Sequence, residues 1–330
     1  MNPDSQLFAQ TIVLGAGSGI GAAVTRALAA KNIPVRAISR NCRRAISQDG
    51  KVEFYPADVL QKDEIIAACR DAKIIYYCAN APYHQWAELL PIMLENVIAA
   101  AAHANAKLIL ADNLYMYPPS TDPLVETLPY APITQKGKIR VKLSEKIMTA
   151  HQQGSIRAAI GRAPDYYGPS ALNSLIINTR TMNALRNHKA LPWIVSADQP
   201  HAIIYVDDFA EGLLILSQQE KALGEIWNIP SPQAITGRQF LTILQEEYDA
   251  QIGAPPRSHS VKIQVFAPWM LLATGMFDPI VREIYEMRYE FDRPYLVDAT
   301  KFLQAFGNFT STPHRLAIRQ TIQNLQLDTQ

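Results

Sequence analysis

The stretch GAGSGIG, residues 15–21, follows a short apolar run at residues 10–14. After it, apolar residues recur at the spacing of one helix face up to Leu28, and Pro34 stands just beyond. A strand, a glycine turn and a helix in this order aim the helix N-terminus at a phosphate, because glycines let backbone N–H groups approach it. The sequence therefore predicts a site for the pyrophosphate of a dinucleotide. The residues expected to contact it are Gly15, Gly17, Ser18, Gly19, Ile20 and Gly21.

A second predicted strand ends at Arg40, nineteen residues after Gly21. This is where a residue that reads the adenosine ribose is expected. A carboxylate there would hold the 2′-hydroxyl group of NAD, whereas a guanidinium group would hold the 2′-phosphate of NADP through charge-assisted hydrogen bonds. We therefore expect NADP(H) to be favoured over NAD(H), with Arg43 and Arg44 close by. In the alternative interpretation these arginines only solvate a loop.

Two further strands end in residues suited to the cofactor. The third predicted strand, residues 52–56, leads to Asp58 and Val59, and a carboxylate at that point suits the adenine amino group. The fourth, residues 73–80, ends in small residues that include Ala79, which would let the backbone lie against the cofactor. We therefore add Asp58, Val59 and Ala79 to the expected cofactor site.

Strands alternate with helices up to residue 112, and this rhythm predicts an α/β fold with a Rossmann-type doubly wound parallel sheet. From about residue 166 the rhythm breaks, and a smaller, mainly helical C-terminal lobe follows, which would hold the substrate. Residues 200–230 return to the sheet. We expect two interleaved domains: an NAD(P)-binding Rossmann domain at 1–165 plus 200–230, and a substrate-binding lobe at 166–199 plus 231–330.

The composition indicates a globular protein that acts on a small molecule. The chain has 330 residues and a formal net charge of +1, with no long charged run of the kind that binds nucleic acid or an anionic membrane. Its three cysteines have no metal-site spacing, and we expect them to be reduced and no metal to be bound. The N-terminus lacks the pattern of a signal peptide, so we expect a cytoplasmic protein.

Four stretches give the chain a specific resemblance. Together with the G-x-x-x-G-x-G spacing of the turn, they resemble the NAD-dependent epimerase/dehydratase family, the extended branch of the short-chain dehydrogenases/reductases. The stretches are DNLYMYPP (112–119), ETLPYAP (126–132), GRAPDYYGP (161–169) and IIYVDDFAEGL (203–213). The resemblance implies hydride transfer at a carbonyl or alcohol carbon, and it implies that Pro164 lies at the cofactor.

The resemblance also shows a replaced catalytic triad. In that family a Tyr-x-x-x-Lys pair and a Ser or Thr do the chemistry, and here the corresponding positions hold Lys136, Arg140 and Asn113. Asn113 still offers an amide to a developing oxyanion, and Arg140 offers a fixed cation for the nicotinamide ribose. The proton donor is left open between Lys136, which is titratable, and Tyr115, which shares the face of Asn113 on an extended segment. These four residues are the predicted catalytic site.

Three functions remain open at this point. The first is an NAD(P)-dependent oxidoreductase or epimerase, and the second is a non-catalytic NADP(H)-binding sensor, favoured by the missing Tyr-x-x-x-Lys pair. The third is a sugar-nucleotide epimerase or dehydratase. It is disfavoured because residues 192–204, where such enzymes hold the second nucleotide, contain neither Gly nor Arg.

The lobe and the long helices suggest the partners. Apolar and aromatic residues of the lobe permit an apolar or aromatic substrate, although most of them should be core. They are Phe266, Trp269, Met270, Phe277, Tyr285, Met287, Tyr289 and Phe291. The resemblance implies a homodimer through two predicted helices, at 86–104 and 134–152, of which the first carries the alanine-rich segment VIAAAAHA.

Overall fold

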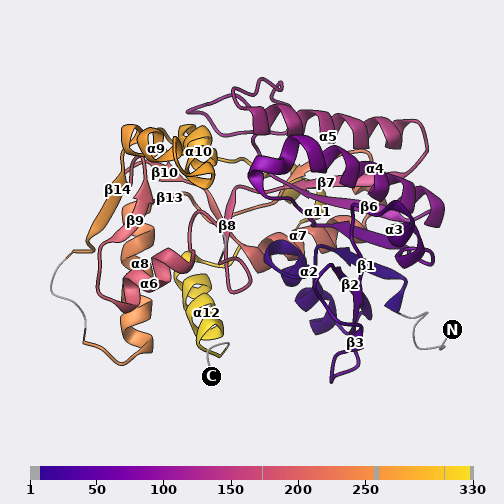
Figure 1. Cartoon of the computed structure of the whole chain (residues 1–330), viewed down its shortest axis with the longest axis horizontal. Helices are drawn as coiled ribbons and strands as arrows, with labels where there is room; N and C mark the ends of the chain where they lie inside the picture. The colour runs from indigo at the N-terminus through magenta and orange to yellow at the C-terminus, as the bar shows by residue number, and fades with distance from the viewer. Residues whose placement is uncertain (1–7, 173, 256–259, 308, 328–330) are drawn as a thin grey trace.

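A computed structural model describes residues 8–172, 174–255, 260–307 and 309–327, and it confirms the predicted Rossmann-type fold (Figure 1). An eight-stranded sheet has the order β12-β7-β6-β5-β1-β2-β4-β3, and all its pairs are parallel except the β3–β4 pair. Its strands are β1 (Thr11–Leu14), β2 (Val35–Ser39), β3 (Ala45–Ile46), β4 (Val52–Pro56), β5 (Ile74–Tyr77), β6 (Lys107–Asp112), β7 (Arg157–Arg162) and β12 (Ile226–Asn228).

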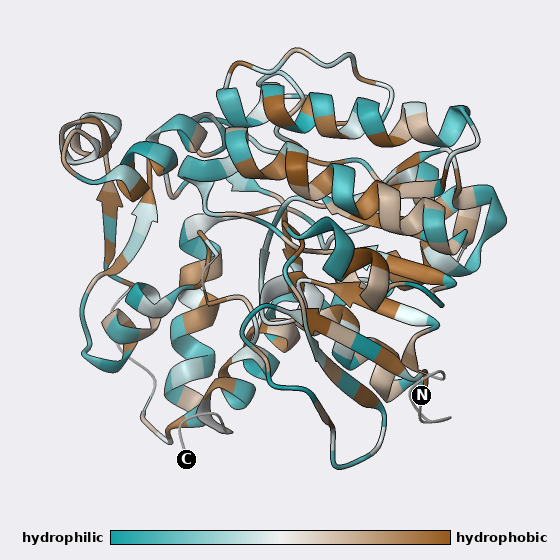
Figure 2. Cartoon of the chain, turned by 45° about the vertical axis from the view of Figure 1, so that its right-hand side comes forward, coloured by the Kyte–Doolittle hydropathy of each residue, from teal (hydrophilic) through white to brown (hydrophobic). Residues whose placement is uncertain are grey.

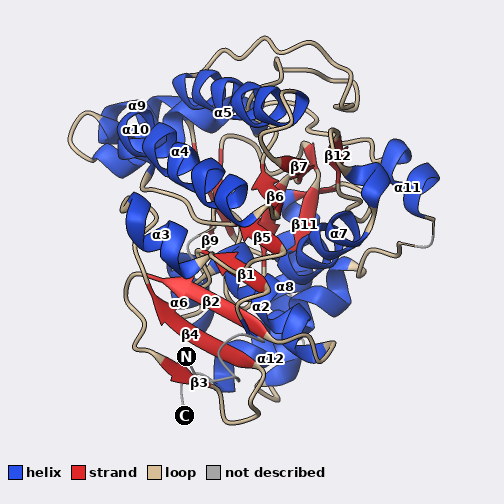
Figure 3. Cartoon of the chain, turned by 90° about the vertical axis from the view of Figure 1, so that its right-hand side faces the viewer, coloured by secondary structure: helices blue, strands red, loops and turns tan. Residues whose placement is uncertain are grey.

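Helices cover both faces of this sheet (Figure 3). One face carries α3 (Lys62–Ala68), α4 (Trp86–Ala104) and α5 (Gln135–Gln152), and the other carries α2 (Gly19–Ala30) and α7 (Val206–Gln218). The strands are mostly hydrophobic, whereas the covering helices alternate between hydrophobic and hydrophilic residues (Figure 2). This is the pattern of a parallel sheet buried between two helical layers. The helical stretch Tyr83–Ala104 is long and apolar enough to cross a membrane, but α4 packs between α3 and α5 over the sheet.

A smaller lobe lies beside the sheet, on the left in Figure 1. Its core joins α6, β9, α8 and α12, and short strand pairs link it to the rest of the chain. The helices of this part are α6 (Thr179–Arg186), α8 (Gly237–Gln251), α9 (Pro268–Gly275), α10 (Pro279–Glu286), η3 (Met287–Glu290) and α12 (His314–Leu327), whereas α11 (Thr300–Phe306) packs against β12 in the sheet domain. The strands are β8 (Asp165–Tyr167), β9 (Leu191–Ile194), β10 (Pro200–His201), β11 (Ile203–Tyr205), β13 (Ile235–Thr236) and β14 (Ile263–Phe266).

The expectation that most aromatic residues of the lobe are core is correct for η3 and wrong for the α9–α10 hairpin. Met287 and Phe291 are buried, at 0% and 2% exposure. Trp269 and Phe277 are 71% and 87% exposed. The difference arises because α10 turns its polar side, with Glu283 and Glu286, toward the sheet domain, so the apolar side of the hairpin is left outside.

Candidate functional site

The glycine turn between β1 and α2 excludes side chains at two positions and leaves space at a third. A Cβ atom on Gly15, whose φ is +85°, would lie 2.5 Å from the Cα atom of Ala79. A Cβ atom on Gly21 would lie 2.2 Å from the carbonyl oxygen of Gly15. A Cβ atom on Gly17, in contrast, would meet nothing closer than Ser39, at 3.5 Å. The protein itself therefore requires Gly15 and Gly21, whereas glycine at position 17 leaves room for a ligand.

Backbone N–H groups at the start of α2 are free to bind an anion. Those of Ile20 and Gly21 have no acceptor among the described residues, and Ser18 precedes the helix without a side-chain capping bond. The N–H group of Gly19 donates instead to the carbonyl oxygen of Ser170, at 2.6 Å, and the Ser170 hydroxyl donates to the carbonyl oxygen of Gly19. The turn can therefore bind a pyrophosphate through the backbone N–H groups of Ile20 and Gly21. The N–H group of Gly19 is not available, because it is bonded to Ser170.

The ends of β2 and β4 hold the residues expected to read the adenosine. Arg40 is exposed and has no partner among the described residues, whereas Arg44 pairs with Glu53 at 3.3 Å. Asp58 lies in the turn before α3, and one oxygen of its carboxylate accepts a hydrogen bond from the backbone N–H group of Leu60 at 3.0 Å. Val59 is buried, and its carbonyl oxygen is bonded to a side-chain amide of α4. Arg40 is therefore available to a phosphate, and the contacts of Asp58 and Val59 with a cofactor stay predictions.

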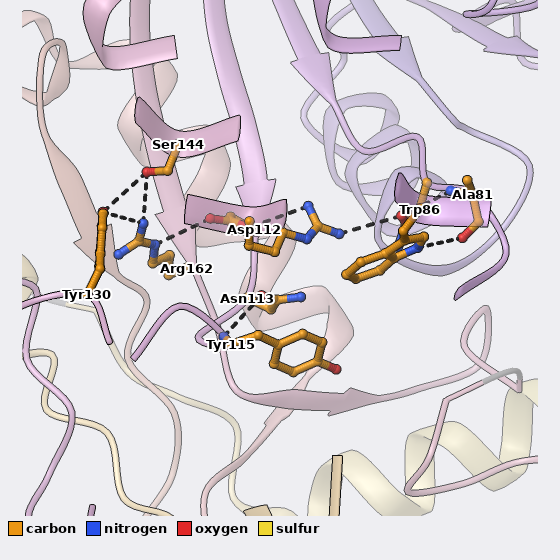
Figure 4. A network of polar contacts seen from close by, with 10 residues as sticks. Ala81, Trp86, Asp112, Asn113, Tyr115, Tyr130, Ser144 and Arg162 are labelled. Atoms are coloured by element: carbon orange, nitrogen blue, oxygen red, sulfur yellow. Dashed lines mark hydrogen bonds and ion pairs between the residues drawn. The ribbon is translucent and has the colours of Figure 1, made fainter. Parts of the chain in front are cut away.

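Arg140 is a buried cation at the carboxyl ends of β5 and β6. Its Cζ atom lies 4.3 Å from the ring centre of Trp86, and one terminal nitrogen lies 3.3 Å from the carboxylate of Asp112 (Figure 4). The other terminal nitrogen donates to the side-chain oxygen of Asn80 at 3.5 Å. Trp86 is fixed in turn by an indole N–H bond to the carbonyl oxygen of Ala81. Arg140 is therefore a fixed guanidinium group at this edge of the sheet.

Asp112 lies between two arginines, which places a buried charge network under the site. Arg162 is fully buried and approaches the second oxygen of Asp112 at 3.3 Å. Asp112 and Arg162 are direct partners in the β6–β7 register, which brings them together. Arg162 also donates to three hydroxyl groups, those of Tyr117, Tyr130 and Ser144. The two arginines share one carboxylate, so the network keeps a net positive charge, and the hydroxyl groups satisfy the remaining donors of Arg162.

Asn113 and Tyr115 lie together just after β6, as Figure 4 shows. The side-chain oxygen of Asn113 accepts a hydrogen bond from the backbone N–H group of Tyr115 at 3.2 Å. The NH₂ group of Asn113 therefore has no partner among the described residues. The Tyr115 hydroxyl lies 3.1 Å from that of Tyr83. Burial raises the pKa of Tyr115 well above its usual value, and the neighbouring Tyr83 and Glu290 add to the effect. Tyr115 is therefore a neutral hydroxyl that can donate and accept but does not ionise by itself.

Lys136 faces the second lobe. Its side chain is 2% exposed, and its ammonium group is bound by the carboxylates of Glu283 and Glu286 on α10. Glu286 also accepts the backbone N–H bonds of Gln135 and Lys136. The proton-donor role expected of Lys136 would require these bonds to break. In this arrangement the residue connects the two lobes.

This connection predicts the effect of removing Lys136. We expect Lys136→Met to lower the free energy of unfolding by about 2 kcal/mol, less than for a fully buried pair because Glu283 and Glu286 keep some contact with water. Limited proteolysis of the α9–α10 hairpin should be faster than in the unmodified protein. Lys138→Met, which removes an exposed lysine from the same helix, is the control. Equal cleavage rates for the two variants would contradict the assignment.

The structure brings most predicted site residues to one edge of the sheet. The carboxyl ends of β1, β5, β6 and β7 meet there, as in other sheets that bind ligands at this edge. They carry Gly15, Ala79, Asn113, Tyr115 and Pro164, and Arg140 reaches the same edge from α5. The sequence reasoning missed Tyr83, Trp86 and Arg162. Arg162 had a signal in the sequence, because it lies in the stretch GRAPDYYGP (161–169), one of the four that carry the resemblance.

Comparison with known proteins agrees with this arrangement. The model of the NAD dependent epimerase/dehydratase family matches residues 11–230. Comparison of the sequence with curated proteins finds no match.

Solved structures share the fold over nearly the whole chain. The crystal structure of gox2253 has a TM-score of 0.75 at 17% identity, covering 97% of this chain and 98% of that one. MoeE5 in complex with UDP-glucose and NAD has a TM-score of 0.76 at 14% identity, covering 97% of this chain and 100% of that one. UDP-glucuronic acid 4-epimerase from Bacillus cereus, in complex with NAD, has a TM-score of 0.75 at 16% identity, covering 96% of each chain. At these identities the likeness shows the fold.

Proposed function

Because this chain belongs to the NAD dependent epimerase/dehydratase family, we propose that it transfers a hydride between a nicotinamide cofactor and a carbonyl or alcohol carbon of a small molecule. The observation that carries the proposal is the arrangement around Arg140. A buried cation, held by Asp112 and stacked on Trp86, stands where the family has its lysine. Beside it lie the free amide of Asn113 and the hydroxyl of Tyr115.

Each of these residues receives one role. Bound at this edge, the cofactor would supply or accept the hydride. The guanidinium group of Arg140 would hold hydroxyl groups of the nicotinamide ribose, because it is a fixed donor of several hydrogen bonds. The Asn113 amide would stabilise charge that develops on the substrate oxygen, and Tyr115 would hydrogen-bond to the same oxygen. Lys136 serves as the link to α10 in this proposal.

Within this proposal the cofactor is NADP(H). Exposed Arg40 and its neighbour Arg43 support this preference, since no acidic side chain stands at this position. MoeE5 and the Bacillus cereus epimerase are solved in complex with NAD, which supports a nicotinamide cofactor and makes the preference a question to test.

The preference predicts a selective effect of Arg40→Ala. We expect NADPH binding to weaken roughly 10- to 50-fold, since about 1.5–2.5 kcal/mol of charge-assisted contact to the 2′-phosphate is lost. NADH binding should change by less than about 2-fold. Titration followed by nicotinamide fluorescence measures both constants, with Arg186→Ala in the second lobe as the control. A loss of equal size for NADPH and NADH would show that Arg40 does not read the phosphate.

The substrate is proposed to be a small molecule other than a nucleoside diphosphate sugar. Several structural neighbours are enzymes of dTDP-glucose or UDP-glucuronic acid, or are solved in complex with a UDP-sugar. In this chain, residues 192–204 offer no arginine and no glycine for a second pyrophosphate. The sugar-nucleotide epimerase remains the alternative within the family, and binding of UDP-glucose measured by calorimetry separates the two.

A sensor that binds NADP(H) without turnover is the second candidate. It is favoured by Lys136, which occupies the tyrosine position and ties the sheet domain to α10 through two carboxylates. Nucleotide binding near this link could then change the position of the hairpin. Oxidation of NADPH by any member of a panel of aldehydes and ketones would exclude this candidate.

We also propose a homodimer through the outer faces of α4 and α5. The two helices lie side by side, and Ile92 on α4 is 44% exposed. Elution at the monomer mass in size-exclusion chromatography would exclude the dimer.

A further inference from the structure

A buried acid cluster lies where the second lobe meets the candidate site. It consists of Asp165 on β8, His201 on β10 and Glu290 at the end of η3. The Nε2 atom of His201 lies 3.0 Å from the carboxylate of Asp165, and its Nδ1 atom lies 3.1 Å from the carbonyl oxygen of Glu290. Phe291 and Tyr295 stack on the two sides of the imidazole, with ring centres 4.4 Å and 5.0 Å away. His201, 2% exposed, is therefore fixed in position and orientation.

The contacts of His201 fix the number of protons that it shares with Asp165. A backbone carbonyl group can only accept a hydrogen bond, so Nδ1 must carry a proton. The bond between Nε2 and Asp165 needs a second proton, because a bare imidazole nitrogen and a carboxylate are both acceptors. The pair therefore exists as imidazolium with carboxylate or as neutral imidazole with carboxylic acid. In either form it holds one proton more than a neutral histidine with an ionised aspartate.

Glu290 holds a second proton. The residue is 1% exposed, and neither carboxyl oxygen makes a hydrogen bond of normal geometry among the described residues. Burial raises the pKa of its carboxyl group well above 4.5, the charge of Asp165 raises it further, and the Tyr295 hydroxyl offsets this only in part. An ionised carboxylate without partners would be very costly at this depth. Glu290 is therefore protonated at neutral pH.

The cluster adjoins the tyrosine pair of the candidate site. Asp165 and Glu290 both raise the pKa of Tyr83, and both raise that of Tyr115, so the two carboxyl groups lie near enough to act electrostatically on these hydroxyls. The Tyr166 hydroxyl would lie 3.3 Å from a Cβ atom on Gly19, which places Tyr166 against the glycine turn. Because neighbouring residues of a strand face opposite sides, Asp165 faces away from the glycine turn and toward the second lobe. The titratable groups around the two carboxyls are Tyr83, Tyr115, Tyr166, His201, Tyr289 and Tyr295.

A small cavity lies at the same junction. It has a volume of about 10 Å³, enough for one water molecule, and Tyr289 and Tyr295 form part of its wall. Tyr289, which precedes Glu290, and Tyr295 thus border a space that a water molecule can enter.

We propose that Asp165, His201 and Glu290 are the proton reservoir of this site, and that Tyr83 and Tyr115 carry the proton to the substrate oxygen. The proposal rests on the hydride-transfer function proposed above. The physical reason for a reservoir is that Tyr115 is buried and, among the described residues, has no unpaired cation beside it that would favour its ionised form. It can give a proton to the substrate only if another group returns one at the same time. The reservoir supplies that proton and replaces the missing Tyr-x-x-x-Lys pair.

The reduction balances in the following way. The hydride from NADPH forms the new C–H bond, and the π electrons of the C=O bond move to the oxygen. The oxygen takes the Tyr115 proton, Tyr115 takes the Tyr83 proton, and Tyr83 takes one from the reservoir. The carbonyl compound is reduced to an alcohol, NADPH is oxidised to NADP⁺, and the reservoir has one proton less until it is refilled from water.

The protonated state of Glu290 predicts an unusual dependence of stability on pH. Because the pKa of the folded state is raised above 4.5, the contribution of Glu290 is fully present below pH 4.5 and is lost as the pH rises through the folded pKa. Glutamine does not ionise, so Glu290→Gln does not show this loss of stability as the pH rises. We therefore expect the melting temperature of Glu290→Gln to rise relative to that of the unmodified protein between pH 5 and pH 8. Glu247→Gln is the control, because Glu247 is also largely buried, at 6% exposure, but is paired with Arg315 and Arg319.

Spectroscopy tests the reservoir without turnover. Infrared spectra at neutral pH should show a protonated carboxyl band that disappears in Glu290→Gln and persists in Glu247→Gln. Nitrogen NMR of labelled protein, with the His201 signals assigned by their loss in His201→Gln, should show a proton on Nδ1. An absent carboxyl band, or an unprotonated Nδ1, would overturn the proposal whether or not the protein is an enzyme.

Turnover tests whether the reservoir is used. With NADPH and a carbonyl substrate, Asp165→Asn should lower kcat by about 100-fold, while the KM for NADPH stays within about 2-fold. Asparagine is nearly isosteric with aspartate and can still hydrogen-bond to His201, so we expect the variant to fold. Circular dichroism checks its folding. Glu290→Gln should also shift the pH profile of kcat. An unchanged kcat and pH profile in both variants would overturn the proposal, while the hydride-transfer function would stand.

Discussion

Arg162→Met is expected to destabilise the protein by about 3–5 kcal/mol, a large share of the total stability of a domain. The variant leaves Asp112 with a single cation and removes the common donor of three hydroxyl groups. Arg162 is fully buried, so water cannot replace these bonds. Urea unfolding followed by circular dichroism measures the difference.

Arg157→Met is the matched control, because Arg157 begins the same strand. Its side chain is 44% exposed, and its partner Glu220 is 68% exposed. Such a surface pair contributes at most about 1 kcal/mol. Equal losses of stability in the two variants would show that the buried network contributes no more than a surface ion pair.

Gly21→Ala is expected to abolish measurable NADPH binding, with a loss of more than about 100-fold, or roughly 3 kcal/mol. The added Cβ atom would lie 2.2 Å from the carbonyl oxygen of Gly15, so the start of α2 must move away from the turn. The amides of Ile20 and Gly21 then no longer converge on the pyrophosphate. We also expect a lower melting temperature for this variant.

Gly17→Ala separates ligand contact from folding. The new methyl group would approach Ser39 at an ordinary 3.5 Å, and Gly17 does not have a positive φ. The melting temperature should therefore stay close to that of the unmodified protein, while NADPH binding weakens by about 10-fold because the methyl group occupies space next to the cofactor. Full affinity in Gly17→Ala would place the pyrophosphate elsewhere.

The sheet and the turn could be predicted because their signals are local. The glycine spacing at 15–21 and the short apolar runs each depend on a few neighbouring residues. The position of Arg140 also followed from counting along one segment. Its environment did not, because Trp86 and Asp112 reach it from two other elements of the fold.

The surroundings of Lys136 could not be predicted from the sequence. Its partners Glu283 and Glu286 are 147 and 150 residues away along the chain, and nothing near Lys136 indicates them. The same holds for Glu290, which the sequence presents as one of several charged residues in an aromatic segment. Only the packing of η3 against β8 and β10 shows that it is buried beside Asp165 and His201.

The most direct test of hydride transfer uses NADPH deuterated at C4 of the nicotinamide, with a panel of aldehydes and ketones. The account predicts that NADPH is oxidised with at least one of them and that mass spectrometry finds the deuterium on the alcohol carbon. This transfer should be lost in Arg140→Leu and kept in Arg186→Ala. Tight NADPH binding with no deuterium transfer to any carbonyl compound would contradict hydride transfer and leave the nucleotide sensor as the better account.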